Sequence, residues 1–287
     1  MLSPWLELPG ADERIGTWSD AIGLDLRTLG TTATAEEITD TAVTQPLVVA
    51  ATLLAYEELT KRGLLAGRAT VTAGHSVGEI AAYSVAGVLN ADDAVSLAAT
   101  RGAEMAKACA VEPTGMAAVL GGDEAEVLAR LEALDLVPAN RNAAGQIVAA
   151  GALSALDKLA EDPPEKARVR KLATAGAFHT HYMGSALEGY AAAAAAVTAG
   201  EPNTTLLSNA DGQAVGSAAD AMTKLVAQLT KPVRWDLCTA TMRNSDVAAI
   251  IEFPPAGTLV GIAKRELRGV PTHAVKTPAD LDGLAAL

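Results

Sequence analysis

Residues 69–88 read ATVTAGHSVGEIAAYSVAGV, and this stretch decides the fold. A short β-branched run ends at Gly74-His75-Ser76-Val77-Gly78, and an alanine-rich helical pattern follows at once. A serine between two glycines at a strand-to-helix turn is typical of a nucleophile elbow, in which both glycines avoid crowding and Ser76 is exposed. The N–H of Val77 is then placed to stabilise an acyl oxyanion at the positive end of the helix. The alternative is an ordinary strand-turn-helix.

Length and composition restrict the class of protein. The chain has 287 residues, 50% of them hydrophobic, which allows one large α/β domain with a small insertion. The net charge of −12 argues against nucleic acid or an anionic membrane surface as partners. The two cysteines lack a CxxC spacing, so neither a disulfide framework nor a metal site is expected. The first residues, MLSPWLELPGADER, lack the pattern of a signal peptide, and we expect a cytoplasmic protein.

Residues 113–177 differ in pattern from the rest of the chain. Short apolar runs and two helical segments alternate there in the order βαββαβ, which predicts a ferredoxin-like unit. Helical and strand patterns typical of an α/β domain stand on both sides of it. We therefore predict a hydrolase-like large domain, formed by residues 1–112 and 178–287 around a central, mostly parallel sheet, with the small domain inserted.

A nucleophilic serine needs a base, and the chain has four histidines. His75 adjoins Ser76 and is expected to support the loop rather than the reaction. His179 stands at the exit of the small domain, where the chain can return over Ser76, and His181 follows two residues later. His273 lies near the C-terminus, the place of the base in α/β-hydrolase esterases. His179 is the expected base, and an esterase that uses His273 is the alternative.

Several motifs resemble those of malonyl-CoA:acyl-carrier-protein transacylases of bacterial type II fatty-acid synthesis, and together they cover nearly the whole chain. They are GHSVGE at 74–79, TRGAEM at 100–105, ANRNAAGQIVAAG at 139–151, GAFHT at 176–180, SNADG at 208–212, KPVRW at 231–235 and EFPPAGTLVGIAKR at 252–265. The resemblance implies a ping-pong enzyme that moves malonyl from malonyl-CoA through a serine ester to the phosphopantetheine thiol of acyl carrier protein. It implies no cofactor and no metal, and we expect a monomer.

The resemblance also implies roles for individual residues. Ser76 is the nucleophile, and His179 is its base, oriented by a main-chain carbonyl that we expect to be that of Arg234. Arg101, on the helix after the elbow helix, binds the malonyl carboxylate through two parallel hydrogen bonds that lysine cannot reproduce. Met105 lies one turn later on the same face and is expected to line the pocket.

Three further residues are expected at the acyl group. Phe178 precedes the base, and in related acyltransferases phenylalanine at this place accompanies malonyl, whereas a smaller residue accompanies methylmalonyl. Asn142 and Gln146 of the small domain are expected to face the site. Two basic groups are candidates for contact with an acidic carrier protein, although ordinary surface charge explains them equally well. They are Lys166, Arg168, Arg170 and Lys171, and Lys264, Arg265 and Arg268.

One motif of the resembled family has no counterpart here. Its members begin with an apolar strand followed by GQG-x-Q, whose glutamine supplies the second oxyanion donor, and this sequence contains no GQG. Loss of one such donor typically costs about 10²- to 10³-fold in rate. On this ground a non-enzymatic alternative stays open, a docking module for the carrier protein without acyl transfer.

Overall fold

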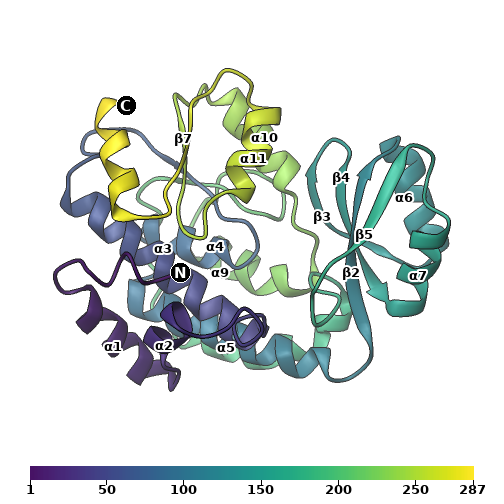
Figure 1. Cartoon of the computed structure of the whole chain (residues 1–287), viewed down its shortest axis with the longest axis horizontal. Coiled ribbons are helices and arrows are strands. Elements are labelled where there is room, and N and C mark those ends of the chain that lie inside the picture. The colour runs from purple at the N-terminus through teal and green to yellow at the C-terminus, as the bar shows by residue number, and fades with distance from the viewer.

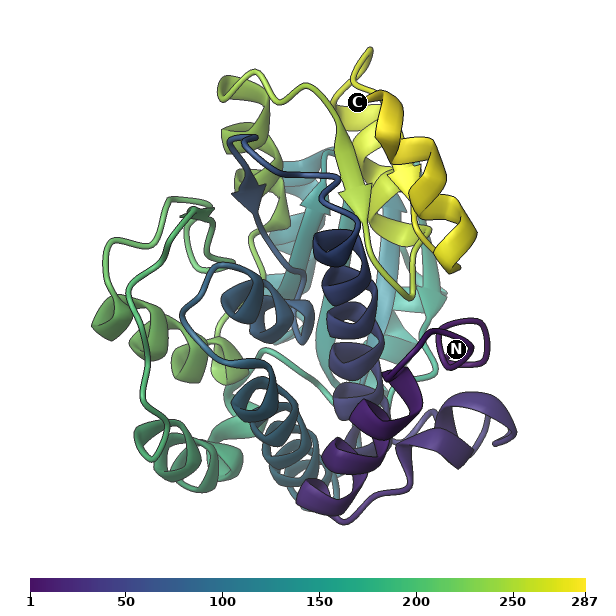
Figure 2. The same cartoon turned by 90° about the vertical axis from the view of Figure 1, so that its left-hand side faces the viewer.

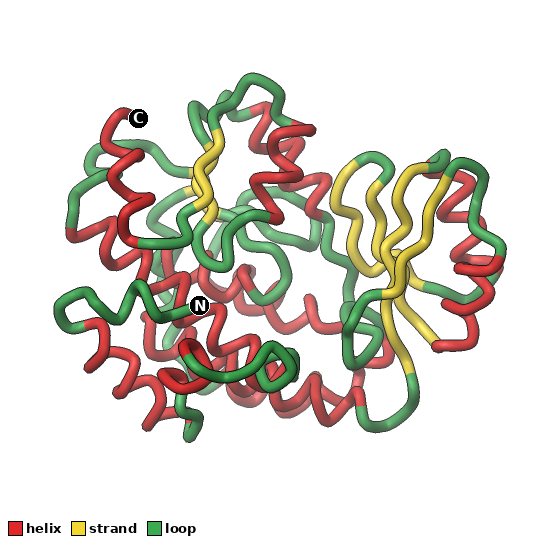
Figure 3. Tube along the Cα trace, viewed as in Figure 1, coloured by secondary structure: helices red, strands yellow, loops and turns green.

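The chain forms a large, mainly helical unit and a small unit that contains the extended sheet (Figures 1 and 3). A computed structural model describes all residues, 1–287. Figure 2 looks onto the large unit, with the strands of the small unit behind it. Both chain termini belong to the large unit, so the small unit is an insertion in it (Figure 1).

Helices of the large unit surround its main hydrophobic core. Its buried side chains come chiefly from α3, α5, α4 and α1, and α3 is apolar around most of its circumference. No helix is both long enough and apolar enough to cross a membrane. The helices are α1 (Ala11–Ile22), α2 (Leu26–Thr31), α3 (Thr41–Lys61), α4 (Gly78–Val85), α5 (Ala91–Cys109), α8 (Leu187–Ala195), α9 (Ala218–Ala227), α10 (Trp235–Asn244) and α11 (Thr258–Glu266), with 3₁₀ helices at His181–Ala186, Gln228–Thr230 and Pro278–Ala286.

The strands of the large unit are short and parallel. β1 (Val71–Thr72) pairs with β6 (Thr205–Leu206), and β7 (Ile250–Glu252) pairs with β8 (Thr272–Ala274). The predicted parallel arrangement is thus present, as two separately hydrogen-bonded pairs. β1 leads into the turn at Ser76, and β6 leads into the loop that follows Leu206, so this pair brings the two loops to the same end.

The small unit has the ferredoxin-like fold that the sequence predicts. Its sheet is antiparallel, in the order β3-β4-β2-β5, which is the arrangement that a βαββαβ unit adopts. Its elements are β2 (Thr114–Gly121), α6 (Glu124–Ala133), β3 (Val137–Ala143), β4 (Gln146–Ala152), α7 (Leu153–Glu161) and β5 (Ala167–Lys171).

The two faces of the small sheet serve different purposes. Side chains such as Ala117 and Val119 point to one face and form a core with α6 and α7. Met116 and Val148 point to the opposite face, where they pack against Ala177 and Phe178. Because neighbouring strand residues alternate between faces, a single strand holds its own helices on one side and the segment before His179 on the other.

Candidate active site

The turn at Ser76 has the conformation of a nucleophile elbow. Ser76 has a positive φ of 54°, which non-glycine residues rarely adopt and which is found at strained functional turns. A Cβ on Gly74 would lie 1.9 Å from the carbonyl oxygen of Gly78, so glycine is required there. A Cβ on Gly78 would meet nothing within 4 Å. The prediction of crowding is therefore wrong for Gly78, because the α4 helix turns this position into open space.

Ser76 and His179 form a hydrogen-bonded pair, as predicted. Oγ of Ser76 lies 2.7 Å from Nε2 of His179, and Nδ1 of His179 lies 2.9 Å from the main-chain oxygen of Gln228. A carbonyl oxygen can only accept, so Nδ1 carries the proton, and Nε2 is free to accept the hydroxyl proton of Ser76. His179 also has a positive φ, of 61°. Both reactive residues thus stand on constrained backbone.

The predicted source of the orienting carbonyl is wrong. The carbonyl of Arg234 accepts the N–H groups of Leu237 and Cys238, since it opens the first turn of α10. Gln228, in the 3₁₀ turn after α9, supplies the carbonyl instead.

Burial keeps His179 in the neutral form that a base requires. Burial lowers the pKa of His179 to about 3, and the positive charge of Arg101 acts in the same direction. A histidine with a lowered pKa stays unprotonated well below 6.5, the ordinary value.

This environment predicts an unusual pH dependence. The rate at which a neutral ester such as p-nitrophenyl acetate acylates Ser76 should not fall as the pH passes down through 6.5. Replacing Arg101 with alanine removes a nearby positive charge, so the pKa of His179 should rise and the acidic loss of rate should move to higher pH. Stopped-flow acylation over a pH series measures both. An acidic limb centred near 6.5 in the unaltered protein would contradict this prediction.

Arg101 lies inside the protein beside this pair. Its side chain on α5 is 1% exposed, with Nη1 donating to Oε1 of Gln45 at 2.7 Å and Nη2 donating to Oε1 of Gln228 at 2.8 Å. Each of these nitrogens keeps another N–H, so two parallel bonds to a carboxylate remain available. The adjacent Gly102 lets α5 approach α3, because a Cβ there would lie 2.6 Å from the oxygen of Thr41.

Met105 and Val77 stand where their predicted roles need them. Met105 is buried one turn beyond Arg101, and its sulfur lies 3.3 Å from Nε2 of Gln45, so it lines the same polar interior. The N–H of Val77 donates to no acceptor in the protein, whereas the N–H of Ser76 is bonded to Oδ1 of Asn209 at 2.8 Å. The elbow thus offers one free donor to an oxyanion, that of Val77.

The other three residues predicted at the acyl group lie in different surroundings. Asn142 reaches the elbow, since its Oδ1 lies 2.8 Å from Nε2 of His75, which supports the loop as expected. Phe178 is half-buried between the core of the large unit and the small sheet. Gln146 instead lies in the β3–β4 hairpin and bonds to Arg265, on a cleft that includes Thr258. The structure therefore links Asn142, but not Gln146, to the site by direct contact.

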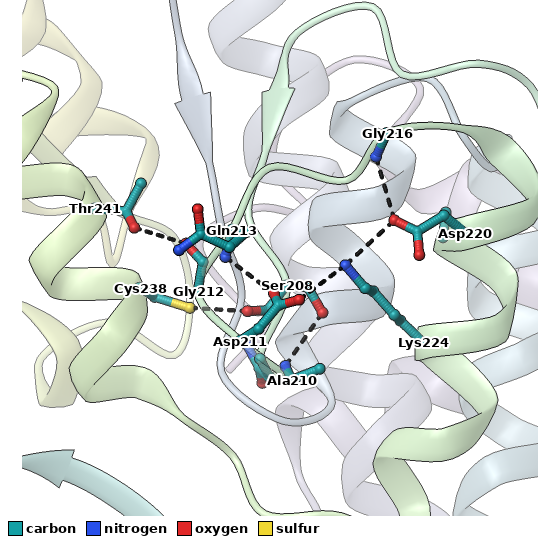
Figure 4. A network of polar contacts seen from close by, with 12 residues as sticks. Ser208, Ala210, Asp211, Gly212, Gln213, Gly216, Asp220, Lys224, Cys238 and Thr241 are labelled. Atoms are coloured by element: carbon teal, nitrogen blue, oxygen red, sulfur yellow. Dashed lines mark hydrogen bonds and ion pairs between the residues drawn. The ribbon is translucent and has the colours of Figure 1, made fainter.

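Asn209 is a site residue that the sequence analysis did not single out, although it stands in the quoted SNADG motif. Its side chain bridges the elbow turn, because Oδ1 accepts the N–H of Ser76 and Nδ2 donates to the oxygen of Gly74 at 2.7 Å. Figure 4 shows how its loop is held from both sides. From α10, Thr241 donates to the oxygen of Gly212 at 2.7 Å, and from α9, Lys224 pairs with Asp211 at 3.2 Å.

The alternative base is not brought to the serine. His273 lies on β8, and its Nε2 is buried without a hydrogen-bond partner. The Ser76 hydroxyl is bonded to His179, so an esterase that uses His273 is excluded by the geometry.

A serine elbow, a neutral histidine base and a buried arginine on an α/β scaffold define a serine enzyme that transfers acyl groups. Residues 17–279 match the acyl transferase domain family. The chain belongs to this family.

Within this family, the chain is similar to proteins with a more specific name. The chain is 81% identical over 291 residues to the malonyl CoA-acyl carrier protein transacylase of Mycolicibacterium smegmatis, with 100% of both chains covered. It is similar to the crystal structure of MCAT from Mycobacterium tuberculosis, with a TM-score of 0.98, 73% identity, and 99% of this chain and 94% of that chain covered. A malonyl-transacylase in complex with a type II PKS acyl-carrier protein has a TM-score of 0.91 and 27% identity, with 100% of this chain and 94% of that chain covered.

Proposed function

We propose that this chain transfers malonyl from malonyl-CoA to the phosphopantetheine thiol of an acyl carrier protein. The observation that carries this proposal is the buried Arg101, which shares Gln228 with the catalytic base. A buried cation is costly unless it is paired, and its only side-chain acceptors here are neutral amides. An acyl group that ends in a carboxylate supplies a charge that contacts Arg101 directly, next to the nucleophile.

The mechanism follows from the geometry of the pair. His179 takes the Ser76 proton at Nε2 while Oγ attacks the thioester carbonyl, and the N–H of Val77 stabilises the oxyanion. Collapse expels the CoA thiolate, which takes the proton back from His179 and leaves malonyl on Ser76. The carrier thiol then attacks this ester in the reverse sense. A thioester is more activated than an amide, so a carbonyl in place of a third acidic residue suffices to orient the base. The proposed reaction needs no cofactor.

The carrier is proposed to meet an exposed basic surface. The net charge of −12 repels an acidic carrier, so local basic groups must offset it. Both candidate groups are exposed, Lys166, Arg168, Arg170 and Lys171 near the edge strand β5, and Lys264, Arg265 and Arg268 near the end of α11. We propose that the enzyme supplies malonyl to fatty-acid synthesis in the cytoplasm.

Mass spectrometry of the intact protein tests the first half-reaction. After mixing with malonyl-CoA, one malonyl group should be found on Ser76 and should leave when a phosphopantetheinylated carrier is added. Ser76→Ala should show no label. Binding of the carrier without any label on Ser76 would overturn the proposal and favour the docking module.

Phe178 is expected to restrict the acyl group to malonyl. Phe178 is half-buried and directly precedes the base, and we propose that its ring takes the space that an α-methyl branch would need. Phe178→Ser should raise the rate with methylmalonyl-CoA relative to malonyl-CoA by about tenfold, since one methyl group is worth about 1–3 kcal/mol in such a pocket. Competition between the two thioesters, read by mass spectrometry of the Ser76 ester, measures the ratio. An unchanged ratio would assign Phe178 to packing alone.

A further inference from the structure

Glu79 is a buried acid that the proposed mechanism does not use. It stands three residues after Ser76 in the first turn of α4 and is 1% exposed. Its Oε1 accepts the N–H of Asn209 at 2.6 Å, and its Oε2 accepts from Nε2 of Gln228. Burial raises the pKa of Glu79, but its hydrogen-bond donors and the charge of Arg101 lower it. Because a donor occupies each of its two oxygens, the bonding pattern favours the ionised carboxylate.

The two partners of Glu79 hold the two halves of the reactive pair. Asn209 bonds the N–H of Ser76 through Oδ1, at 2.8 Å. The main-chain oxygen of Gln228 accepts a hydrogen bond from Nδ1 of His179 at 2.9 Å, and its side-chain oxygen accepts one from Nη2 of Arg101 at 2.8 Å. One carboxylate therefore connects the nucleophile's turn, the base and the buried arginine.

The direction of these hydrogen bonds is fixed by chemistry. A guanidinium has only donors, so the side-chain oxygen of Gln228 must face Arg101 and its amino group must face away. The groups that meet this amino group must accept. Glu79 does so through Oε2, and Oδ1 of Asn209 accepts over a longer distance of 3.3 Å. Turning the amide over would oppose a donor to Arg101 and an acceptor to Glu79. Arg101 and Glu79 together therefore fix the orientation of Gln228.

We propose that Glu79 is a positioning residue, which holds Gln228 and Asn209 so that Arg101, His179 and Ser76 keep the geometry for transfer of a carboxylate-bearing acyl group. The part that concerns the acyl carboxylate rests on the proposed function. The part that concerns Ser76 and His179 stands without it, and the two parts give separate readouts.

The first test replaces Glu79 with glutamine, which has the same shape. An amide has one oxygen for the two donors of Asn209 and Gln228. Either the N–H of Asn209 loses its acceptor, or Gln228 keeps only its longer contact with Oδ1 of Asn209, at 3.3 Å. The loss costs about 1–3 kcal/mol, or about 5- to 150-fold in rate. Glu79→Gln should lower kcat for malonyl transfer and the acylation of Ser76 by p-nitrophenyl acetate, each measured per folded protein. Unchanged rates with only a lower Tm would overturn the proposal.

The second test exchanges the two groups. In Glu79→Gln combined with Gln228→Glu, the new carboxylate at 228 accepts from Arg101 and from the new amide at 79, whose oxygen accepts from Asn209. Side-chain volume and the number of buried charges are kept, so the double variant is informative even if Glu79→Gln folds poorly. Acylation by p-nitrophenyl acetate should recover part of the loss seen in Glu79→Gln, because both donors regain acceptors. Recovery is incomplete because Oδ1 of Asn209, which accepts from Gln228, then faces a carboxylate oxygen. Malonyl transfer should stay low, because the carboxylate at 228 already pairs with Arg101.

A matched control separates positioning from stability. Glu252 is also buried, and it caps α11 by accepting from Gly257, Leu259 and Val260. Glu252→Gln should lower Tm without changing either rate per folded protein. A double variant that acylates no faster than Glu79→Gln would overturn the positioning role. If malonyl never labels Ser76 but the p-nitrophenyl acetate pattern holds, the proposed function fails and the positioning role stands.

Discussion

Replacing His179 with alanine is expected to lower the rate of malonyl transfer by about 10²- to 10⁴-fold, the range for loss of a general acid–base group. Nε2 of His179 is the one side-chain nitrogen bonded to Oγ of Ser76, at 2.7 Å. Without it, the serine hydroxyl must lose its proton to water, and the leaving thiolate loses its proton source. Transfer of malonyl from CoA to a phosphopantetheinylated carrier, followed by mass spectrometry, measures the loss.

His273→Ala is the control for this prediction. His273 lies on β8 and its Nε2 has no hydrogen-bond partner, so its removal should change the rate less than about twofold, as distant substitutions without a catalytic partner do. A large loss in His273→Ala with a small one in His179→Ala would restore the esterase interpretation. Tm should be recorded for both variants, because His179 is also part of the buried network.

Local signals made the reactive residues predictable. The residues that form the turn around Ser76 are adjacent in the sequence, so their pattern predicts the turn directly. The position of His179 follows from the return of the chain out of the small unit. The orienting carbonyl was not predictable in the same way. Any residue has a main-chain oxygen. The carbonyl of Arg234 accepts two N–H groups of α10, whereas that of Gln228 accepts one, from Lys231, and keeps a lone pair for His179. This difference is a property of the fold.

In the fold, too, some elements were predictable from local sequence patterns and others were not. The small unit was predictable because its strands are long enough to show alternation and its helices long enough to show a period. The strands of the large unit have two or three residues each and carry too little pattern to reveal which strands pair. The buried network around Glu79 was missed for another reason. Its members come from distant segments, and only α4, α5 and the loops after β6 and α9 bring them together.

Arg101→Ala is expected to lower kcat/KM for malonyl-CoA by about 10²- to 10³-fold, since breaking a buried ion pair costs about 3–5 kcal/mol. The loss should be far smaller with acetyl-CoA, which has the same thioester and no carboxylate. With malonyl-CoA, the kcat/KM of Arg101→Lys should lie between those of the unaltered protein and Arg101→Ala. The reason is that an ammonium keeps the charge but cannot make two parallel bonds. The rates of malonyl and acetyl transfer, measured with each variant, give the ratio of the loss with malonyl-CoA to the loss with acetyl-CoA.

The ratio must be corrected for damage to the base, because Arg101 also donates to Gln228, whose main-chain oxygen orients His179. Acylation of Ser76 by p-nitrophenyl acetate supplies this correction, since that ester is neutral and needs only the pair. If malonyl and acetyl transfer fall equally, and the neutral ester falls with them, Arg101 acts through Gln228 alone and does not bind the carboxylate. If malonyl transfer falls much further than the other two, the difference is the share of transition-state binding that comes from the carboxylate.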